Sequence, residues 1–147
     1  MRFLDISRLA SHKGGVFTGI DRVEMAYLRW FLKTPGEVGF VIATKWGMIW
    51  LDRLGGNAFR TYLENPGNKT PLQVARELAF QRLLWPFVSR RLRTYLQVEF
   101  FSVGHNKSIL RFLPAFSKVP QACITVMLHD VIPLSHPEYS TPKAIHR

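Results

Sequence analysis

The chain has 147 residues, a length that suits one domain with a hydrophobic core of its own. Its hydrophobic content of 47% and charged content of 20% are those of a globular protein and argue against wholesale disorder. The single cysteine, Cys123, excludes an internal disulfide and is interpreted as an inert core thiol of a cytoplasmic protein. No uncharged apolar stretch reaches the ~18 residues of a membrane span.

The charge balance is strongly basic. Lysine and arginine total 20 against 10 aspartates and glutamates, which gives a formal net charge of +10. Such an excess attracts phosphates, nucleic acid and anionic lipid without choosing among them. We therefore expect an acidic partner.

The amino-terminal segment predicts a strand, a glycine turn and a helix. Residues 3–9 are apolar enough for a buried strand, and residues 12–15 form a flexible turn. Thr18, followed three residues later by Asp21, resembles a capping box at the start of the helix. The helical residues expected to share the buried face are Ile20, Val23, Tyr27, Trp30 and Phe31.

Glycines cluster where this turn meets the helix. A helix amino terminus exposes unpaired N–H groups and the positive end of its dipole, and small residues let a phosphate approach them. Contact with a donor phosphate or an acceptor is therefore a hypothesis for Gly14, Gly15, Thr18 and Gly19. Glycines are also common in any turn between a strand and a helix, so a purely structural role stays open.

The next part of the chain predicts two strands and a short helix. Residues 38–42 form the second expected strand, and residues 49–51 follow a turn as a further strand or hairpin arm. A short helix is expected over residues 58–63, followed by a surface loop over residues 64–71.

Residues 72–96 have the composition of a basic amphipathic helix. Arginines such as Arg90 and Arg93 stand among large apolar side chains, a combination typical of helices that lie on a membrane surface. Pro86 lacks a backbone N–H, so we expect a kink or a split into two helices around Trp85. A core-packed helix with a solvated basic face explains the same residues.

A strand predicted over residues 98–103 ends in small and polar residues. His105 and Asn106 follow it and are candidates for the lining of a crevice, with a loop cap as the alternative. An apolar turn is expected over residues 110–116 before the last strand begins.

That last strand stops at an adjacent pair of ionisable residues. Residues 124–128 are apolar or β-favouring without alternation, which predicts a strand covered on both faces by helices in a parallel α/β sheet. In open sheets ligands bind beyond the carboxyl ends of the strands. His129 could act there as acid, base or donor, with Asp130 nearby, and we take both as candidate catalytic residues. A capping aspartate and a structural histidine would leave the same pattern.

Three blocks then carry a family resemblance: the first strand with Asp5, TGIDRVEMAYLRWF at residues 18–31, and HDVIPLSHPEY at residues 129–139. Together they resemble the amino-terminal half of bacterial glycosyltransferases of the GT-B architecture, within family 4, often labelled group 1. In that family two Rossmann-like domains face each other. The first mainly holds the acceptor, and the second binds the nucleotide sugar through a pair of glutamates. The reaction retains the configuration of the sugar and needs no metal or other cofactor.

The resemblance implies a role for each candidate residue. The glycine turn would approach the donor diphosphate, His129 would lie near the reacting sugar, and Asp130 would support its loop. The implied partners are a nucleotide sugar, bound only with the second domain, and a glycan or lipid-linked acceptor. The implied setting is polysaccharide biosynthesis in the cytoplasm, peripheral at the inner face of the plasma membrane.

We therefore expect residues 1–147 to form one α/β domain, a Rossmann-like open parallel sheet flanked by helices, without the nucleotide-sugar domain. Thr141 and Pro142 favour a helix start with only five residues after them, which predicts a truncated glycosyltransferase that is inactive alone. The alternative is a non-catalytic basic module that binds an anionic membrane surface or nucleic acid. No nucleic-acid motif is recognised, so nucleic acid is the less favoured partner.

Overall fold

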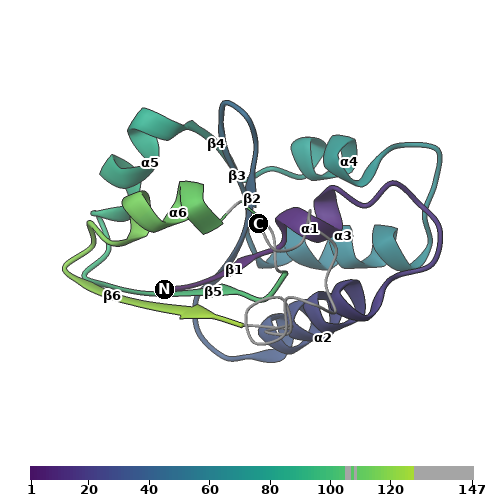
Figure 1. Cartoon of the computed structure of the whole chain (residues 1–147), viewed down its shortest axis with the longest axis horizontal. Helices are drawn as coiled ribbons and strands as arrows, with labels where there is room; N and C mark the ends of the chain where they lie inside the picture. The colour runs from purple at the N-terminus through teal and green to yellow at the C-terminus, as the bar shows by residue number, and fades with distance from the viewer. Residues whose placement is uncertain (105–106, 108, 128–147) are drawn as a thin grey trace, which may run out of the picture.

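A computed structural model describes residues 1–104, 107 and 109–127, and a six-stranded sheet forms the centre of this part of the chain (Figure 1). The strands are β1 (Arg2–Asp5), β2 (Val38–Ala43), β3 (Gly47–Leu51), β4 (Gln81–Leu84), β5 (Gln97–Ser102) and β6 (Gln121–Val126). The helices are α1 (Ser7–Ala10), α2 (Gly19–Lys33), α3 (Arg53–Glu64), α4 (Pro71–Glu77), α5 (Trp85–Leu92) and α6 (Ile109–Phe116).

The sheet is mixed but mostly parallel, with the strand order β4-β3-β2-β1-β5-β6. Strand β1 pairs in parallel with β2 on one side and with β5 on the other, and β6 pairs in parallel with β5. Strand β3 runs antiparallel between β2 and β4, as the expected hairpin arm. The α/β fold with a Rossmann-like sheet flanked by helices is therefore confirmed.

Helices cover the sheet on both faces. Because side chains alternate along a strand, Leu4 and Phe3 of β1 point into different apolar clusters. The Leu4 cluster takes its helical residues from α1, α2, α3 and α4, and the Phe3 cluster takes them from α5 and α6. Figure 1 shows these two groups of helices at opposite ends of the view.

The first strand is shorter than predicted. It ends at Asp5, and Leu9 lies in α1 rather than in the strand. The Asp5 side chain accepts a hydrogen bond from the Ser7 backbone N–H at 2.9 Å, which turns the chain at once. Leu9 is still buried, but as part of a helical turn that lies over the end of the strand.

Helix α2 begins with the predicted capping box, and its predicted buried face is right for Phe31 but wrong for Trp30. Thr18 is the N-cap and exchanges hydrogen bonds with Asp21, as the pattern predicted. Trp30, expected inside, is 53% exposed. The residues buried along the helix are Asp21, Glu24, Met25, Leu28 and Phe31. The helix is turned so that two acidic residues face inward, and the reason lies in the polar network described below.

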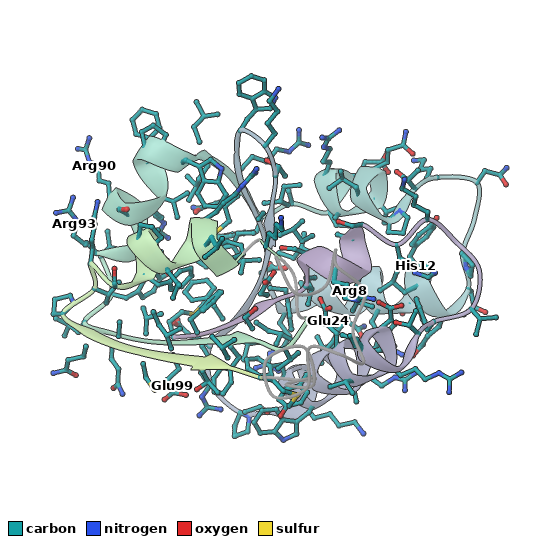
Figure 2. The ribbon with its side chains drawn as sticks, viewed as in Figure 1. Arg8, His12, Glu24, Arg90, Arg93 and Glu99 are labelled. Carbon is teal, nitrogen blue, oxygen red and sulfur yellow. The ribbon has the colours of Figure 1, made fainter. Side chains whose placement is uncertain are left out.

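Residues 72–96 do not form one helix. They contain α4, then β4 at the edge of the sheet, then α5, which begins at Trp85 with Pro86 in its first turn. The predicted split around Trp85 is confirmed, because proline is well suited to the first helical turn. The strand between the helices was not predicted. Arg90 of this segment points away from the body of the molecule (Figure 2).

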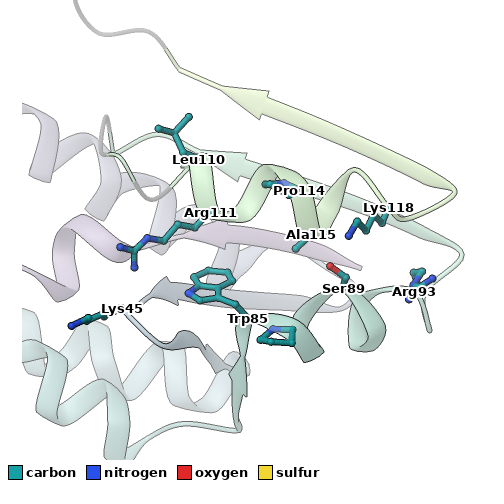
Figure 3. A pocket seen from close by; sticks show the side chains of 10 residues that line it. Lys45, Trp85, Ser89, Arg93, Leu110, Arg111, Pro114, Ala115 and Lys118 are labelled. Carbon is teal, nitrogen blue, oxygen red and sulfur yellow. The ribbon is translucent and has the colours of Figure 1, made fainter. Parts of the chain in front are cut away.

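Two further segments are more helical than predicted. The helix expected over residues 58–63 is α3, which begins earlier, at Arg53. The apolar turn expected over residues 110–116 is the helix α6, because Phe112 and Phe116 lie one turn apart and pack together on Phe100. Figure 3 shows α6 beside α5, with a cavity between them.

Within the part of the chain that the structure describes, the last strand is largely exposed rather than covered on both faces, contrary to the prediction. Strand β6 ends the strand order and, among the described residues, pairs only with β5. Most of its residues are exposed, including Val126 at 45%. Cys123 is exposed as well, so its interpretation as a core thiol is wrong. An apolar run without alternation does not distinguish a central strand from an edge strand.

Candidate functional site

The candidate site lies at the carboxyl edge of the sheet, where the loops after β1 and β5 diverge. After β1 the chain continues to β2, which pairs with one side of β1, and β5 later pairs with the other side. The direction in which strands follow one another therefore reverses between β1 and β5. Ligands of open α/β sheets bind in the crevice at such a point. Asp5 and Ser102, the last residues of β1 and β5, are paired in register there.

Asp5 connects the ends of three strands. Its Oδ1 atom accepts hydrogen bonds from the Ser7 backbone N–H at 2.9 Å and the Ser7 hydroxyl at 2.5 Å. Its Oδ2 atom accepts one from the Ser102 hydroxyl at 3.1 Å. The Ser7 oxygen in turn accepts a hydrogen bond from the Ala43 backbone N–H of β2 at 2.8 Å. Asp5 is fully buried, so these bonds hold the edge of the sheet in one arrangement.

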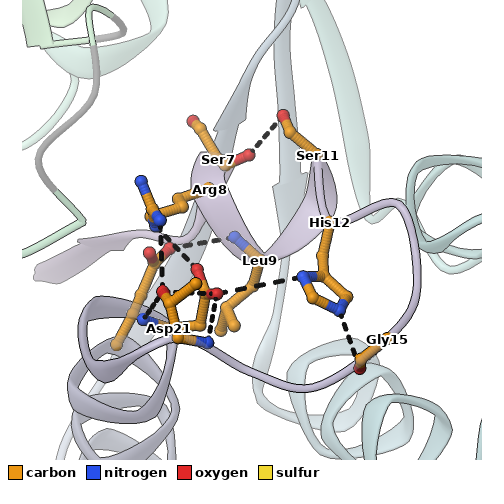
Figure 4. Close-up of polar contacts among 9 residues, drawn as sticks. Ser7, Arg8, Leu9, Ser11, His12, Gly15 and Asp21 are labelled. Atoms are coloured by element: carbon orange, nitrogen blue, oxygen red, sulfur yellow. Dashed lines mark hydrogen bonds and ion pairs between the residues drawn. The ribbon is translucent and has the colours of Figure 1, made fainter.

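A second group of polar residues joins α1 to the start of α2 (Figure 4). Arg8 Nε donates to Asp21 Oδ1 at 2.6 Å, and Arg8 Nη2 donates to Thr18 Oγ1 at 3.2 Å. The Thr18 backbone N–H donates to Asp21 Oδ2 at 2.8 Å. Burial alone would raise the pKa of Asp21, but the bonds from Thr18 and Arg8 outweigh it, and the pKa lies below its ordinary value. Asp21 is therefore a buried carboxylate that stays ionised.

Glu24 is the least satisfied group of the network. Its side chain is fully buried, and its Oε1 atom accepts only a long hydrogen bond from the Leu9 backbone N–H at 3.5 Å. Among the described residues, its Oε2 atom has no hydrogen-bond partner. Burial raises the pKa of Glu24 well above its ordinary value, and the Asp5 carboxylate adds to the rise. Glu24 therefore favours the protonated form, whereas Asp21 stays ionised.

Gly104, in the loop after β5, lies directly against Glu24. A Cβ atom at Gly104 would lie 2.3 Å from Glu24 Oε2, closer than any real contact of that kind. Glycine is required here by close approach rather than by its backbone angles. The carboxyl group of Glu24 is therefore fully buried directly against this loop.

The predicted glycine turn is held by His12. Gly14 and Gly15 have φ angles of +90° and +89°, a backbone region that favours glycine. His12 Nε2 lies 3.3 Å from the Gly15 carbonyl oxygen and donates to it, while Nδ1 lies 3.9 Å from Asp21 Oδ2. The turn is thereby connected to the Arg8–Asp21 pair (Figure 4).

The glycine turn also borders a cavity of about 410 Å³. The turn forms one wall, and the chain between α3 and α4 forms the other. The lining residues are His12, Lys13, Gly14, Gly15, Phe17, Tyr62, Leu63, Pro66, Gly67, Lys69, Thr70 and Pro71. Lys13 is a cation of this lining without an ion-pair partner among the described residues, whereas Lys69 is paired with Glu77 at 2.7 Å. The cavity could hold a small anionic or polar ligand.

The predicted contact residues therefore separate into two places. Gly14 and Gly15 line the cavity, whereas Thr18 and Gly19 lie at the start of α2 and do not. The Thr18 side chain accepts from the helix N–H of Asp21, and the Asp21 carboxylate accepts from the Thr18 N–H, so internal partners occupy much of that amino terminus. Ligand binding by these four residues stays a prediction.

The other predicted site residues lie outside the described residues. These are the candidate catalytic pair His129 and Asp130, and the candidate lining residues His105 and Asn106. The last described residue, Met127, lies at the same sheet edge, because its N–H donates to the Ser102 carbonyl oxygen at 3.0 Å. The roles of these four residues stay predictions.

Sequence reasoning missed Ser7, Arg8, Glu24 and Ser102. A second helical stripe was present in α2, since Glu24 lies on the same side as Met25, Leu28 and Phe31 at a helical spacing. Apolar spacing does not indicate that stripe, because it includes charged residues. Ser102 was visible as a polar residue at a strand end, but its pairing with Asp5 depends on the strand order, which no local signal gives.

Comparisons with family models, curated proteins and solved structures gave no match to this chain. Two further findings concern the described residues alone. None of the helices there is long and apolar enough to cross a membrane. No group of three or more histidine, cysteine, aspartate or glutamate side chains in that part is arranged to hold a metal ion.

Proposed function

We propose that this domain is the acceptor-side lobe of a glycosyltransferase of the GT-B type. It would work with a second lobe that binds the nucleotide sugar, and it would transfer the sugar to a glycan or lipid-linked acceptor. The resemblance suggests this reaction, and the mostly parallel sheet with a switch point beside β1 is compatible with it.

One observation carries the proposal. Two blocks of the resemblance, the strand ending at Asp5 and the segment that begins at Thr18, lie close together at the carboxyl edge, because Asp5 acts electrostatically on Glu24 of α2. Arg8 of α1, which follows that strand directly, is bonded to Thr18 and Asp21 at the start of α2. A network of this kind can hold the adjoining loops in one geometry, which group transfer between two lobes requires.

In the proposed reaction the network residues position the loops, and His129 is the group nearest the reacting sugar. Asp5, Arg8 and Asp21 take part in hydrogen bonds within the fold, so we assign them no contact with substrate. The cavity beside Gly14 and Gly15 would receive a polar part of donor or acceptor.

The experiment is a reconstitution. The chain is mixed with a separately expressed nucleotide-sugar lobe of the same glycosyltransferase family, and transfer of radiolabelled sugar to bacterial lipid extract is measured. We expect no transfer by the chain alone, transfer by the mixture, and loss of at least 100-fold with His129→Ala, by analogy with the loss of general acid–base catalysis. The exposed Cys123→Ser variant is the matched control and should retain transfer.

Two results would overturn the proposal. Full transfer by the isolated chain would show that no second lobe is needed. Unchanged transfer with His129→Ala in an active mixture would remove the proposed role of that residue.

A second candidate function is a non-catalytic module on an anionic membrane surface. Phe87 and Arg90, one turn apart on α5, are both exposed, with Phe87 at 53%. An exposed aromatic beside arginines suits lipid headgroups. Flotation with anionic vesicles, run beside a gel shift with random DNA, shows whether the chain binds a membrane surface or nucleic acid. DNA binding at physiological salt that falls steeply with added salt would favour nucleic acid instead.

A further inference from the structure

A cavity of about 550 Å³ lies between α5 and α6, away from the polar network (Figure 3). Its wall includes four basic side chains, from Lys45, Arg93, Arg111 and Lys118, together with Trp85 and Ser89. Figure 3 shows Lys45 and Arg111 at one end of the cleft and Arg93 and Lys118 at the other. The lining contains no acidic residue.

Within the described residues, the four cations have no acidic counter-charge. None of them forms an ion pair with a residue in the described part of the chain. Other basic residues behave differently, because Arg29 and Arg60 both bind Glu64, and Arg8 binds Asp21. Four positive charges around one cavity repel one another, and an anion bound between them would remove that cost.

Several donors and an apolar wall are available to such an anion. Arg111 Nη1 donates to the Thr44 carbonyl oxygen at 2.5 Å, which fixes the guanidinium and leaves its other N–H groups for a ligand. Trp85 Nε1 donates to the same oxygen at 3.2 Å, so the indole ring presents mainly its apolar surface. Ser89 adds a hydroxyl donor.

These features together match a phosphorylated organic ligand. Guanidinium groups bind phosphate oxygens in pairs, and lysine binds them as a point charge. The cavity volume is within the usual range for small-molecule sites. Cations at both ends suit a ligand whose charge is spread over more than one phosphate, or a phosphate with a polar group beyond it.

We propose that the cleft between α5 and α6 binds a ligand that carries phosphate groups, held by Lys45, Arg93, Arg111 and Lys118 against the Trp85 ring. This inference does not depend on the proposed sugar transfer. The phosphate could belong to a soluble compound or to a lipid headgroup, and the experiment distinguishes these sources.

The test compares two double variants that lose the same charge. Arg93→Gln with Lys118→Gln removes two cations of the cleft, and Arg22→Gln with Lys107→Gln removes two exposed cations outside its lining. Binding of inorganic diphosphate is measured by calorimetry at low salt, and binding to phosphatidylglycerol vesicles by flotation. Backbone amide NMR shifts of Ser89 and Ala115 report whether the cleft is the site.

We expect at least a tenfold loss of affinity in the cleft variant and less than a twofold loss in the control variant. If this pattern appears with diphosphate, the source is a soluble phosphate, and if it appears only with vesicles, the source is a lipid headgroup. Equal losses in the two variants, or no binding of either probe by the wild-type chain, would overturn the proposal. Circular dichroism of both variants checks that they are folded.

Discussion

The polar network at the carboxyl edge and the cleft between α5 and α6 use charge in opposite ways. At the edge, the buried carboxylates of Asp5 and Asp21 are hydrogen-bonded within the fold. In the cleft, four cations have no acidic partner among the described residues. Figure 2 shows Arg8 and Glu24 of the network far from Arg93 of the cleft. Paired charges position the chain, whereas unpaired charges around a cavity remain available for a ligand.

The comparison therefore predicts large stability effects at the edge and small ones in the cleft. The largest is expected from Asp5→Ala, which leaves the Ser7 N–H and the Ser7 and Ser102 hydroxyls without their acceptor. Each buried unsatisfied donor costs about 1–3 kcal/mol, so we expect a loss of about 3 kcal/mol in the free energy of unfolding. Urea denaturation measures it. A loss below 0.5 kcal/mol, the usual size of a surface effect, would show that the hydrogen bonds of Asp5 do not stabilise this edge more than surface residues do.

Gly104→Ala tests the close contact with Glu24. The new methyl group would overlap Glu24 Oε2, so the loop or the helix must shift, at a cost of about 1–3 kcal/mol. Gly19→Ala is the matched control, because a Cβ there meets nothing within 4 Å. A double-mutant cycle with Glu24→Ala should recover much of the loss, and a loss that is not recovered would place the strain elsewhere.

Asp21→Asn should cost about 1–2 kcal/mol at neutral pH, because it weakens the charged hydrogen bond from Arg8. The folded state lowers the pKa of Asp21 below its ordinary value of 3.8. Its contribution is therefore fully present above that pH and is lost as the pH falls through the folded pKa. Thermal unfolding of the two proteins should differ at pH 7 and converge in strong acid; a difference that does not shrink would argue against an ionised Asp21.

Glu24 should give a pH dependence of the opposite sign. Its pKa in the folded state is raised above the ordinary value of 4.5, so its contribution is present below that pH. The contribution is lost as the pH rises through the folded pKa, because the buried side chain must then ionise. Glu24→Gln should change the free energy of unfolding by less than about 1 kcal/mol at pH 4, because the amide keeps the size of the side chain. At pH 8 the variant should be the more stable protein, and parallel pH profiles would contradict this.

The smallest effect is expected in the cleft. Arg93→Gln and Lys118→Gln should each change the free energy of unfolding by less than about 0.5 kcal/mol, since neither cation has an acidic partner among the described residues. A slight gain at low salt would be consistent with relief of repulsion. Chemical denaturation at two salt concentrations measures both effects, and a loss above 1 kcal/mol would place these side chains among the structural residues.

Part of the candidate site could be predicted from the sequence. The glycine turn and the capping box at Thr18 are local signals, because they depend on residues within a few positions of each other. The buried face of α2 could not be predicted from apolar spacing, because Asp21 and Glu24 occupy it. Acidic side chains are rarely buried, so a rule based on hydrophobicity assigns them to solvent. Here other segments supply partners for Asp21, and burial shifts Glu24 toward its neutral form.

The α/β class, the start of α2, the split at Trp85 and the excess of positive charge could all be predicted from the residues alone, because each depends on composition or on neighbouring residues. The contact between Ser102 and Asp5, the edge position of β6 and the gathering of four distant cations around one cleft depend on the folded arrangement. Strand order and helix packing bring together residues up to 97 positions apart, and no local pattern carries that information.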